Sequence, residues 1–209
     1  MAEKETTKYI IGIDEVGRGP IAGPVAVCTF LIKDDNFLQS AIGLAYGKAL
    51  PKLKDSKKLS KKQREVWFVF LKDQKEKGNC DYAVSFVSSE NIDKFGIVKC
   101  IQKALNQSLE KVTSQKVFPA SFRIFLDGGL KAPAEYVNQE TIIRGDELHP
   151  VISLASIVAK VSRDAVMTKY GKDYPEYGFE RHSGYGTRAH YSAIKTAGLT
   201  LIHRKSFIH

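Results

Sequence analysis

The 209-residue sequence has no segment typical of export or membrane insertion. No stretch reaches the roughly 18 consecutive apolar residues that a membrane-spanning helix needs. Residues 1–8 are polar and contain no apolar signal-peptide core. We therefore expect a cytoplasmic protein. With no repeat, linker or low-complexity segment in view, we also expect a monomer with a single domain over residues 1–209.

Cysteine is scarce, which argues against disulfide and zinc chemistry. Three cysteines are an odd number, and their wide spacing matches neither a disulfide framework nor a zinc motif. The histidines are equally scattered and suit no zinc spacing. We expect the cysteines to serve as small buried hydrophobic residues. They are Cys28, Cys80 and Cys100.

Acidic residues are outnumbered, so the chain carries a formal charge of +9 from 32 Lys and Arg against 23 Asp and Glu. Basic side chains that neutralise phosphates release counterions and supply affinity without sequence preference. The same excess also occurs on soluble proteins as a solubilising surface. Composition therefore favours a nucleic-acid partner without establishing one.

The order of apolar segments predicts an α/β fold with a mixed five-stranded sheet flanked by helices. The expected strands are 9–14, 25–32, 80–87, 122–127 and 140–144. The expected helices are 61–77, one that starts after Ser89, 151–170 and 188–196. Residues 34–52 are less regular and fit either a short helix or a loop. We expect a core over about 9–170 and a helical extension over about 171–209.

Acidic residues lie at the ends of several expected strands. Asp14 and Asp127 each end an apolar strand, and chain-reversing glycines follow both. Asp146 follows the fifth strand, and Glu15 adjoins Asp14. Neighbouring side chains of a regular strand point to opposite faces, so we expect the strand to bend after Asp14. If the strands are neighbours in one sheet, these carboxylates gather at one place.

A carboxylate cluster of this kind favours divalent cations. Like charges a few ångströms apart raise one another's pKa, and oxygen-seeking ions such as Mg²⁺ or Mn²⁺ relieve that repulsion. Two ions about 4 Å apart can hold a phosphodiester, activate a water and stabilise the departing oxygen. The alternative is that the acids are solvated loop residues.

A glycine-rich turn follows the first strand, over residues 17–24. A dinucleotide fingerprint requires a helix at this point, and the strand-like run 25–32 excludes one. Because glycine has no side chain, the backbone of the turn can lie close to a nucleic-acid sugar. The amides of the turn can hydrogen-bond the 2′-hydroxyl that distinguishes RNA from DNA. A tight turn without a ligand is the alternative.

Six ordered blocks of sequence resemble the ribonuclease HII family, which is the type 2 ribonuclease H family. The first is Gly12-Ile-Asp-Glu-Val-Gly-Arg-Gly-Pro20. The later blocks are Asp55-Ser-Lys-Lys-Leu-Ser60, Leu126-Asp-Gly128, Gly145-Asp146, Ala155 to Asp164 and Tyr177 to Thr187. The resemblance covers residues 9 to 207.

The resemblance implies a ribonuclease H-like fold with a C-terminal helical extension. It implies cleavage of the RNA strand of RNA–DNA hybrids and nicking 5′ of single ribonucleotides in duplex DNA, as in ribonucleotide excision repair and DNA replication. The products are a 5′-phosphate and a 3′-hydroxyl. Such an enzyme uses two divalent ions, Mg²⁺ or Mn²⁺. The competing interpretations are a metal-dependent exonuclease and a non-catalytic hybrid-binding module.

The resemblance also assigns roles to individual residues. The catalytic metal ligands correspond to Asp14, Glu15, Asp127 and Asp146. The substrate-binding residues correspond to Gly17, Arg18 and Gly19 at the ribose, Tyr185 stacked on the junction sugar, and Ser56 or Lys57 at a phosphate. Ser183 stands where lysine is frequent in the family, which removes one phosphate contact. No domain of the related type 3 enzymes precedes residue 9, which favours type 2.

Three further residues near these blocks have open interpretations. We interpret Asp164 as structural or as supporting the site, since it lies four residues from Lys160 on the expected helix. Lys160 suits either a phosphate contact or a solvated helix face. His182 suits either a substrate contact or a structural role. Trp67 lies in an apolar run and is interpreted as core.

Overall fold

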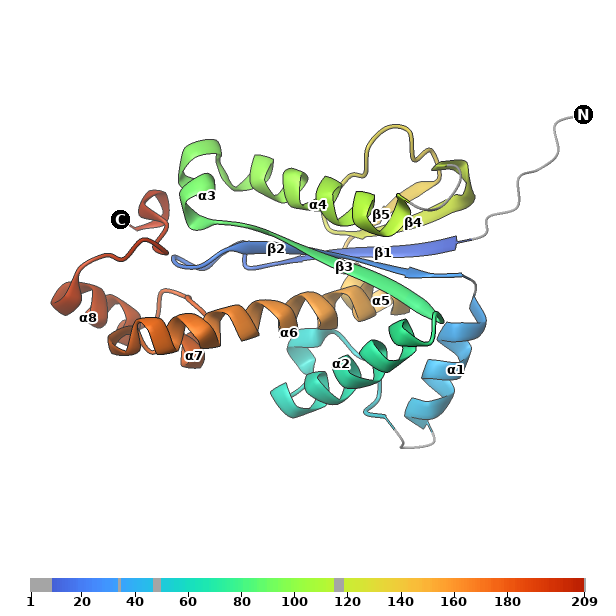
Figure 1. Cartoon of the computed structure of the whole chain (residues 1–209), viewed down its shortest axis with the longest axis horizontal. Coiled ribbons are helices and arrows are strands. Elements are labelled where there is room, and N and C mark those ends of the chain that lie inside the picture. Colours follow the sequence, from blue (N-terminus) through green and yellow to red (C-terminus); the bar gives the residue numbers. More distant parts are fainter. Residues whose placement is uncertain (1–8, 34, 47–49, 115–118, 209) are drawn as a thin grey trace, which may run out of the picture.

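A five-stranded mixed sheet forms the centre of the molecule, with strand order β3-β2-β1-β4-β5 (Figure 1). The structure is a computed structural model and describes residues 9–33, 35–46, 50–114 and 119–208. The strands are β1 (Tyr9–Val16), β2 (Val25–Ile32), β3 (Cys80–Val87), β4 (Phe122–Asp127) and β5 (Gln139–Ile142). The first three are antiparallel, whereas β1, β4 and β5 run parallel.

Helices cover both faces of the sheet (Figure 1). The helices before the second half of the sheet are α1 (Asp35–Tyr46), α2 (Lys61–Glu76), α3 (Ser89–Phe95) and α4 (Ile97–Thr113). The later ones are α5 (Gly145–Leu148), α6 (Pro150–Asp173), α7 (Phe179–His182) and α8 (Arg188–Ala197). Short 3₁₀ turns are η1 (Ser56–Lys58), η2 (Pro119–Ser121), η3 (Pro175–Tyr177) and η4 (Lys205–Phe207). No helix within these residues is both long and apolar enough to cross a bilayer.

Strand β2 shows how the two core layers arise. It is buried along its whole length, and its side chains alternate between two hydrophobic clusters. Val25, Val27 and Leu31 join the cluster against α4. Phe30 and Ile32 join the cluster under α6 and α2. The sheet therefore lies between two apolar layers, as a continuous apolar strand predicts.

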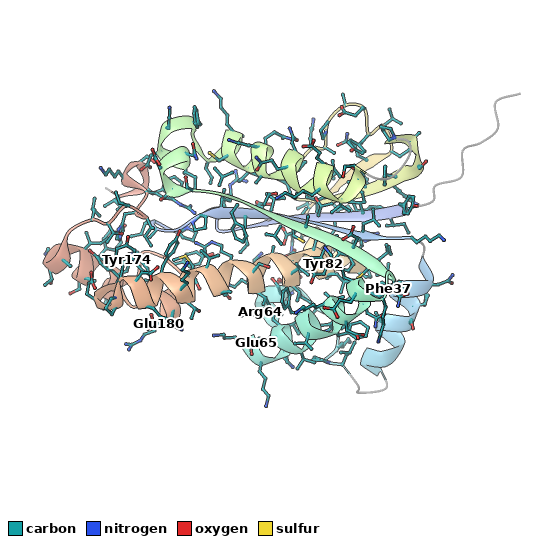
Figure 2. The ribbon with its side chains drawn as sticks, in the orientation of Figure 1. Phe37, Arg64, Glu65, Tyr82, Tyr174 and Glu180 are labelled. Atoms are coloured by element: carbon teal, nitrogen blue, oxygen red, sulfur yellow. The ribbon has the colours of Figure 1, made fainter. Side chains whose placement is uncertain are left out.

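Aromatic rings fill the space between the sheet and helices α1 and α2. Figure 2 shows Phe37 and Tyr82 at this end of the molecule. Phe30 stacks on Tyr82 with ring centroids 6.0 Å apart, and Phe37 stacks on Phe70 at 6.5 Å. Trp67 is fully buried and its indole N–H donates to the Pro51 carbonyl, which confirms its predicted place in the core.

Gly12 lets the long helix α6 approach the sheet. A Cβ at this position would lie 2.3 Å from the Val151 carbonyl oxygen, far inside van der Waals contact. Glycine therefore permits the start of α6 to lie directly against β1. This contact places the polar residues of α6 next to β1, the strand that contains Asp14 and Glu15.

The predicted fold class is confirmed, and the expected strands and helices are found with shifted ends. Ser60 and Gln63 form the predicted capping box at the start of α2. The next helix begins one residue earlier than expected, because Ser88 rather than Ser89 is its N-cap, and Gly96 with φ of +80° separates α3 from α4. Strand β5 ends at Ile142, before the left-handed Arg144.

The region 34–52, the cysteines and the border between core and extension can also be compared with expectation. The irregular region 34–52 contains α1, although positions 34 and 47–49 lie outside the described residues. The three cysteines are buried and unpaired with one another, as predicted. Helix α6 continues through Asp173, so the expected border near residue 170 falls inside a helix, and the division into core and extension stays a prediction.

Candidate metal centre and substrate-binding turn

Three carboxylates converge where β1 and β4 end. Ligand oxygens of Asp14, Glu15 and Asp127 all lie within 4.8 Å of one another. Parallel pairing of β1 with β4 brings the two strand ends together. Strand β1 stays paired with β2 as far as Val16, and the expected bend after Asp14 stays a prediction. Both neighbouring acids therefore enter the cluster from one continuous strand.

Asp146 lies beside this trio rather than within it. Its carboxylate pairs with the Lys57 ammonium at 3.1 Å. The backbone amides of Gly145 and Asp146 donate to Asp127 Oδ1 at 2.6 and 3.4 Å, so the start of α5 holds Asp127 in place. The structure thus brings all four predicted acids to one region, three of them into mutual contact distance.

Burial and mutual repulsion disfavour the charged form of these acids. Asp14 is only 5% exposed, and burial followed by the charges of Glu15, Asp127 and Asp146 raises its pKa well above the usual value. Burial and then Asp127 raise the pKa of Glu15. Burial and then Asp146 raise the pKa of Asp127. A divalent cation removes this repulsion, so the donor set fits a hard metal ion.

The glycine-rich turn follows the acids directly. Gly17 has a φ of +87°, and Arg18 ion-pairs with Glu15 at 3.7 Å. A Cβ on Gly19 would lie 3.9 Å from the Tyr185 ring. Tyr185 is 47% exposed, so its ring is available at the surface beside the turn. Arg18 and Gly19 of the predicted ribose-reading turn therefore lie at the surface near Tyr185 and next to the acids, whereas Gly17 is buried.

The two residues of the Asp55-Ser-Lys block lie differently from each other. Ser56 is buried, and its hydroxyl lies 2.7 Å from the Ser156 hydroxyl. The side chain of Lys57 is 76% exposed and faces Asp146. Lys57 is thus open to a phosphate, whereas Ser56 points into the protein. The substrate contact of either residue stays a prediction.

Comparison with known proteins decides the family. A family model described as Ribonuclease HII matches residues 11–209. The chain belongs to the ribonuclease HII family. It is therefore a ribonuclease H, a hydrolase of the RNA strand of RNA–DNA hybrids, as the sequence blocks predicted. Members of this family depend on a divalent metal, which agrees with the carboxylate cluster.

Individual relatives agree with this assignment. A ribonuclease HII of Endomicrobium trichonymphae is 41% identical over 198 residues, covering 95% of this chain and 84% of the relative. The crystal structure of ribonuclease H2 from Pyrococcus horikoshii matches with a TM-score of 0.68 and 25% identity, covering 95% of this chain and 93% of that one.

A more distant structure shows the same fold. Bst-RNase HIII in complex with Mn²⁺ matches with a TM-score of 0.67 and 16% identity, over 98% of this chain and 68% of that one. The ribonuclease H-like fold predicted from the sequence is thus confirmed.

Serines of α6 support the site and were missed by sequence reasoning. The Ser156 hydroxyl hydrogen-bonds Asp14 as well as Ser56. Ser153 donates to the Asp146 carbonyl at 2.7 Å. Their spacing of three residues places both on one face of α6, and that spacing is the signal that was available. In this ribonuclease HII family member, α6 thus hydrogen-bonds the carboxylate of Asp14 and the backbone of Asp146.

The three residues left open all have structural partners. Asp164 accepts from Lys160 at 2.8 Å and from the Ser183 hydroxyl at 2.9 Å, which matches the structural interpretation. His182 contacts the Tyr177 carbonyl through Nε2 at 2.9 Å and accepts from the Gly184 amide. These bonds tie α6 to the segment that carries Tyr185.

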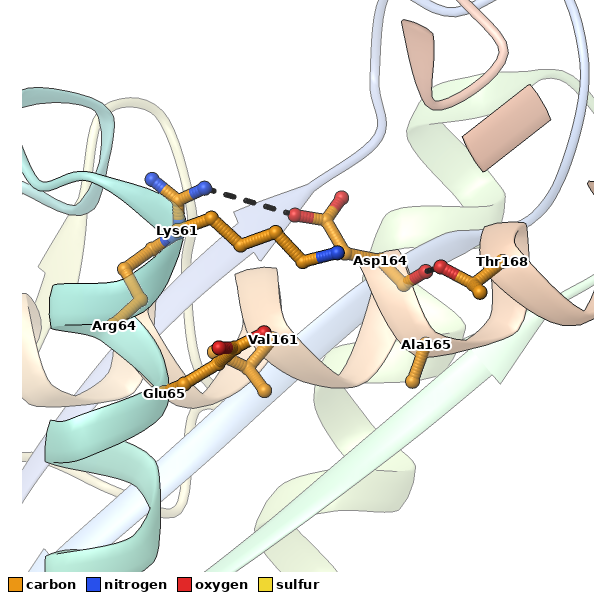
Figure 3. Close-up of a pocket in the computed structure, with 7 residues that line it drawn as sticks. All are labelled: Lys61, Arg64, Glu65, Val161, Asp164, Ala165 and Thr168. Carbon is orange, nitrogen blue, oxygen red and sulfur yellow. Dashed lines mark hydrogen bonds and ion pairs between the residues drawn. The ribbon is translucent and has the colours of Figure 1, made fainter. Parts of the chain in front are cut away.

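A groove of about 310 Å³ lies between α2 and α6 (Figure 3). Figure 3 shows Arg64 joined to Asp164 across it, at 3.9 Å. Glu65 adds a second negative charge to the same groove. None of the four acids lines this groove, so the groove is separate from the carboxylate cluster. The lining residues are Lys61, Arg64, Glu65, Val161, Asp164, Ala165 and Thr168.

Two buried histidines hold the backbone of Tyr185. The Thr200 amide donates to His203 Nδ1 at 2.9 Å, so His203 carries its proton on Nε2. That proton is donated to His190 Nε2 at 3.0 Å, and His190 Nδ1 donates to the Tyr185 carbonyl at 2.9 Å. Both rings are neutral in this arrangement, because protonating either acceptor nitrogen removes a bond.

We expect this relay to weaken in acid. Burial lowers the pKa of His190, and burial with the neighbouring His190 lowers the pKa of His203 to about 4. The unfolded chain therefore binds more protons than the folded chain between about pH 6.5 and 4. As the pH falls through this window, the contribution of His203 to the free energy of unfolding decreases by about 3 kcal/mol. Histidine ring titration by NMR checks this. A His203 ring that titrates near pH 6.5 contradicts it.

Proposed function

We propose that this enzyme nicks duplex DNA on the 5′ side of a single embedded ribonucleotide, as well as cutting longer RNA strands of hybrids. The products are a 5′-phosphate and a 3′-hydroxyl. The observation that carries the proposal is the ion pair between Arg18 and Glu15 of the carboxylate trio, with the exposed Arg18 and Gly19 next to Tyr185. Chemistry and ribose recognition thus share one surface.

Two divalent ions, Mg²⁺ or Mn²⁺, are proposed as cofactors, held by Asp14, Glu15, Asp127 and Asp146. The raised pKa of Asp14 and the convergence of three carboxylates support this donor set. Bound there, such ions supply neutralisation of the phosphodiester, activation of the attacking water and stabilisation of the leaving oxygen.

The protein itself supplies position. Ser156 and the Glu15 amide both hydrogen-bond the Asp14 carboxylate, the latter at 2.8 Å. The amide of Gly145 fixes Asp127 at 2.6 Å. These bonds hold the acids in one arrangement before substrate arrives, which lowers the entropy cost of assembling the reactive geometry. Lys57 beside Asp146 is proposed to contact a substrate phosphate.

Recognition of the ribose is assigned to the turn and the tyrosine. The turn amides near Gly17, Arg18 and Gly19 are proposed to hydrogen-bond the 2′-hydroxyl, which DNA lacks. The Tyr185 ring is proposed to stack on the sugar at the RNA–DNA junction. The exposure of Arg18 and Tyr185 supports both roles.

An end-labelled DNA duplex carrying one ribonucleotide tests the proposed function. With Mg²⁺ or Mn²⁺ we expect an internal nick 5′ of the ribonucleotide, and with chelator no product. Mononucleotides released from an end indicate an exonuclease, and no product under any metal condition indicates a binding module. Either result overturns the proposal.

Removing the tyrosine ring tests recognition alone. We expect Tyr185→Ala to lower kcat/KM for the single-ribonucleotide duplex by about tenfold to a hundredfold, because stacking on an aromatic ring contributes about 1–3 kcal/mol. Tyr185→Phe keeps the ring and is the matched control, with activity close to wild type. Cleavage by Tyr185→Ala at the wild-type rate shows that the ring has no such role.

A further inference from the structure

Two arginines are fully buried beneath the glycine-rich turn. Arg163 on α6 and Arg204 near the C-terminus both have no exposed surface. Over the described ranges of the chain, neither forms an ion pair with a carboxylate. A buried charge is strongly destabilising unless hydrogen bonds replace its hydration. The partners of these two guanidinium groups therefore indicate what they are for.

Arg163 binds the far half of the turn and the segment before Tyr185. Its Nε donates to the Pro24 carbonyl at 2.9 Å, and Nη2 donates to the Ala22 carbonyl at 3.3 Å. Its Nη1 donates to the Ser183 carbonyl at 2.9 Å. One guanidinium thus joins the turn to the chain segment that carries Tyr185.

Arg204 binds the near half of the turn. Its Nη2 donates to the Gly17 carbonyl at 2.7 Å and Nη1 to the Arg18 carbonyl at 3.0 Å. Its Nε donates to the Gly23 carbonyl at 2.9 Å. All three side-chain nitrogens of each arginine are therefore used on backbone carbonyls of this region.

The glycine at position 17 makes room for this arrangement. A Cβ there would lie 2.2 Å from Arg163 Nε, in addition to the strain of a φ of +87°. The guanidinium of Arg163 therefore packs directly against the backbone of the turn. A larger residue at this position displaces the arginine.

The direction of these bonds sets the direction of the turn amides. In a trans peptide the C=O and the next N–H point opposite ways, and the described residues contain no cis peptide. Because the carbonyls of Gly17 and Arg18 point inward to Arg204, the amides of Arg18 and Gly19 point outward. Both residues are exposed, and no described residue accepts a hydrogen bond from either amide.

We infer that Arg163 and Arg204 are positioning residues for ribose recognition: they pull the carbonyls of the turn inward so that its amides face the substrate. The inference rests on the proposed function. Their two positive charges also repel each other beneath the turn. Burial followed by the charge of Arg163 lowers the pKa of Arg204 to about 9, and the charge of Asp93 acts in the opposite direction.

The test compares Arg204→Lys and Arg204→Ala with wild type on the single-ribonucleotide duplex. Lysine keeps the charge but not the fork of donors, so we expect kcat/KM to fall by about tenfold to a hundredfold. Mn²⁺ affinity, measured by calorimetry, is expected to stay unchanged, because neither arginine touches the acids. Methylguanidinium added to Arg204→Ala is expected to restore part of the lost activity by filling the vacated site.

Tyr177→Phe is the matched control for stability. It removes a hydrogen bond to the Gly198 carbonyl at 2.8 Å in the same C-terminal region and no hydrogen bond to the turn. Wild-type kcat/KM in Arg204→Lys overturns the inference. So does an equal loss in Tyr177→Phe at equal unfolding free energy. If wild type itself does not nick at the ribonucleotide, the proposed function fails first, and the two failures are thereby distinguished.

Discussion

Asp127→Asn is expected to lower the cleavage rate of an RNA–DNA hybrid by about a thousandfold or more, because a metal-site carboxylate is lost. Asparagine keeps an oxygen that accepts from the Gly145 amide, so the local backbone remains in place. What disappears is one negative charge of the trio. The change therefore removes metal affinity with little change in shape.

Single-turnover cleavage and hybrid binding are measured side by side. Hybrid binding is expected to survive, since basic groups and the turn, rather than Asp127, are proposed to hold the duplex. Asp73→Asn on α2 is the control, since this exposed acid pairs with Lys77 and is not part of the trio. Retention of metal-dependent cleavage by Asp127→Asn removes this residue from the catalytic site.

Asp14→Asn is expected to abolish cleavage and yet to raise the melting temperature of the metal-free protein. Burial and three neighbouring acids raise the pKa of Asp14 in the folded chain. The folded state therefore binds more protons than the unfolded state at pH values above the ordinary pKa of an aspartate, so stability falls as the pH rises from that value toward the raised pKa of Asp14. At neutral pH the charged carboxylate destabilises the fold, and asparagine removes that charge while keeping an acceptor for the Glu15 amide.

The size of this effect follows from general scales. A relief of about 1 kcal/mol raises Tm by roughly 2–4 °C for a chain of this length. Mn²⁺ is expected to stabilise wild type strongly and Asp14→Asn weakly, because only the intact site binds the ion well. Thermal unfolding in chelator and in Mn²⁺ measures both. A variant that melts below wild type in chelator contradicts the repulsion argument. A site that trades stability for activity in this way is common among enzymes.

The four acids were predictable because local sequence marks them. Asp14 and Asp127 lie near the ends of two apolar strands, Glu15 adjoins Asp14, and the parallel pairing of β1 with β4 brings Asp14 and Asp127 together. The position of Asp146 was less predictable. Whether it enters the trio depends on how α5 packs, and in the structure it pairs with Lys57 instead of closing the cluster.

The partners of the supporting residues were not predictable from local pattern, although the spacing of Ser153 and Ser156 places both on one helix face. Ser156 reads as one small residue in an apolar helix, and Arg204 as one more basic residue near the end of a basic chain. Their roles depend on partners 142 and 187 positions away, respectively the carboxylate of Asp14 and the carbonyl of Gly17. Such long-range hydrogen bonds leave no periodicity in the sequence.

The sequence by itself determined the α/β class, the strands, the capping box at Ser60 and the family, because these depend on short-range pattern and on ordered blocks. The tertiary structure alone decided that α6 lies against Gly12, that two serines hold the acids, and that two buried arginines hold the turn. The physical reason is distance along the chain. Packing brings together charged groups and carbonyls that lie far apart in the sequence, so neighbouring residues do not predict these contacts. The hydrogen bonds between them become strong only when water is excluded.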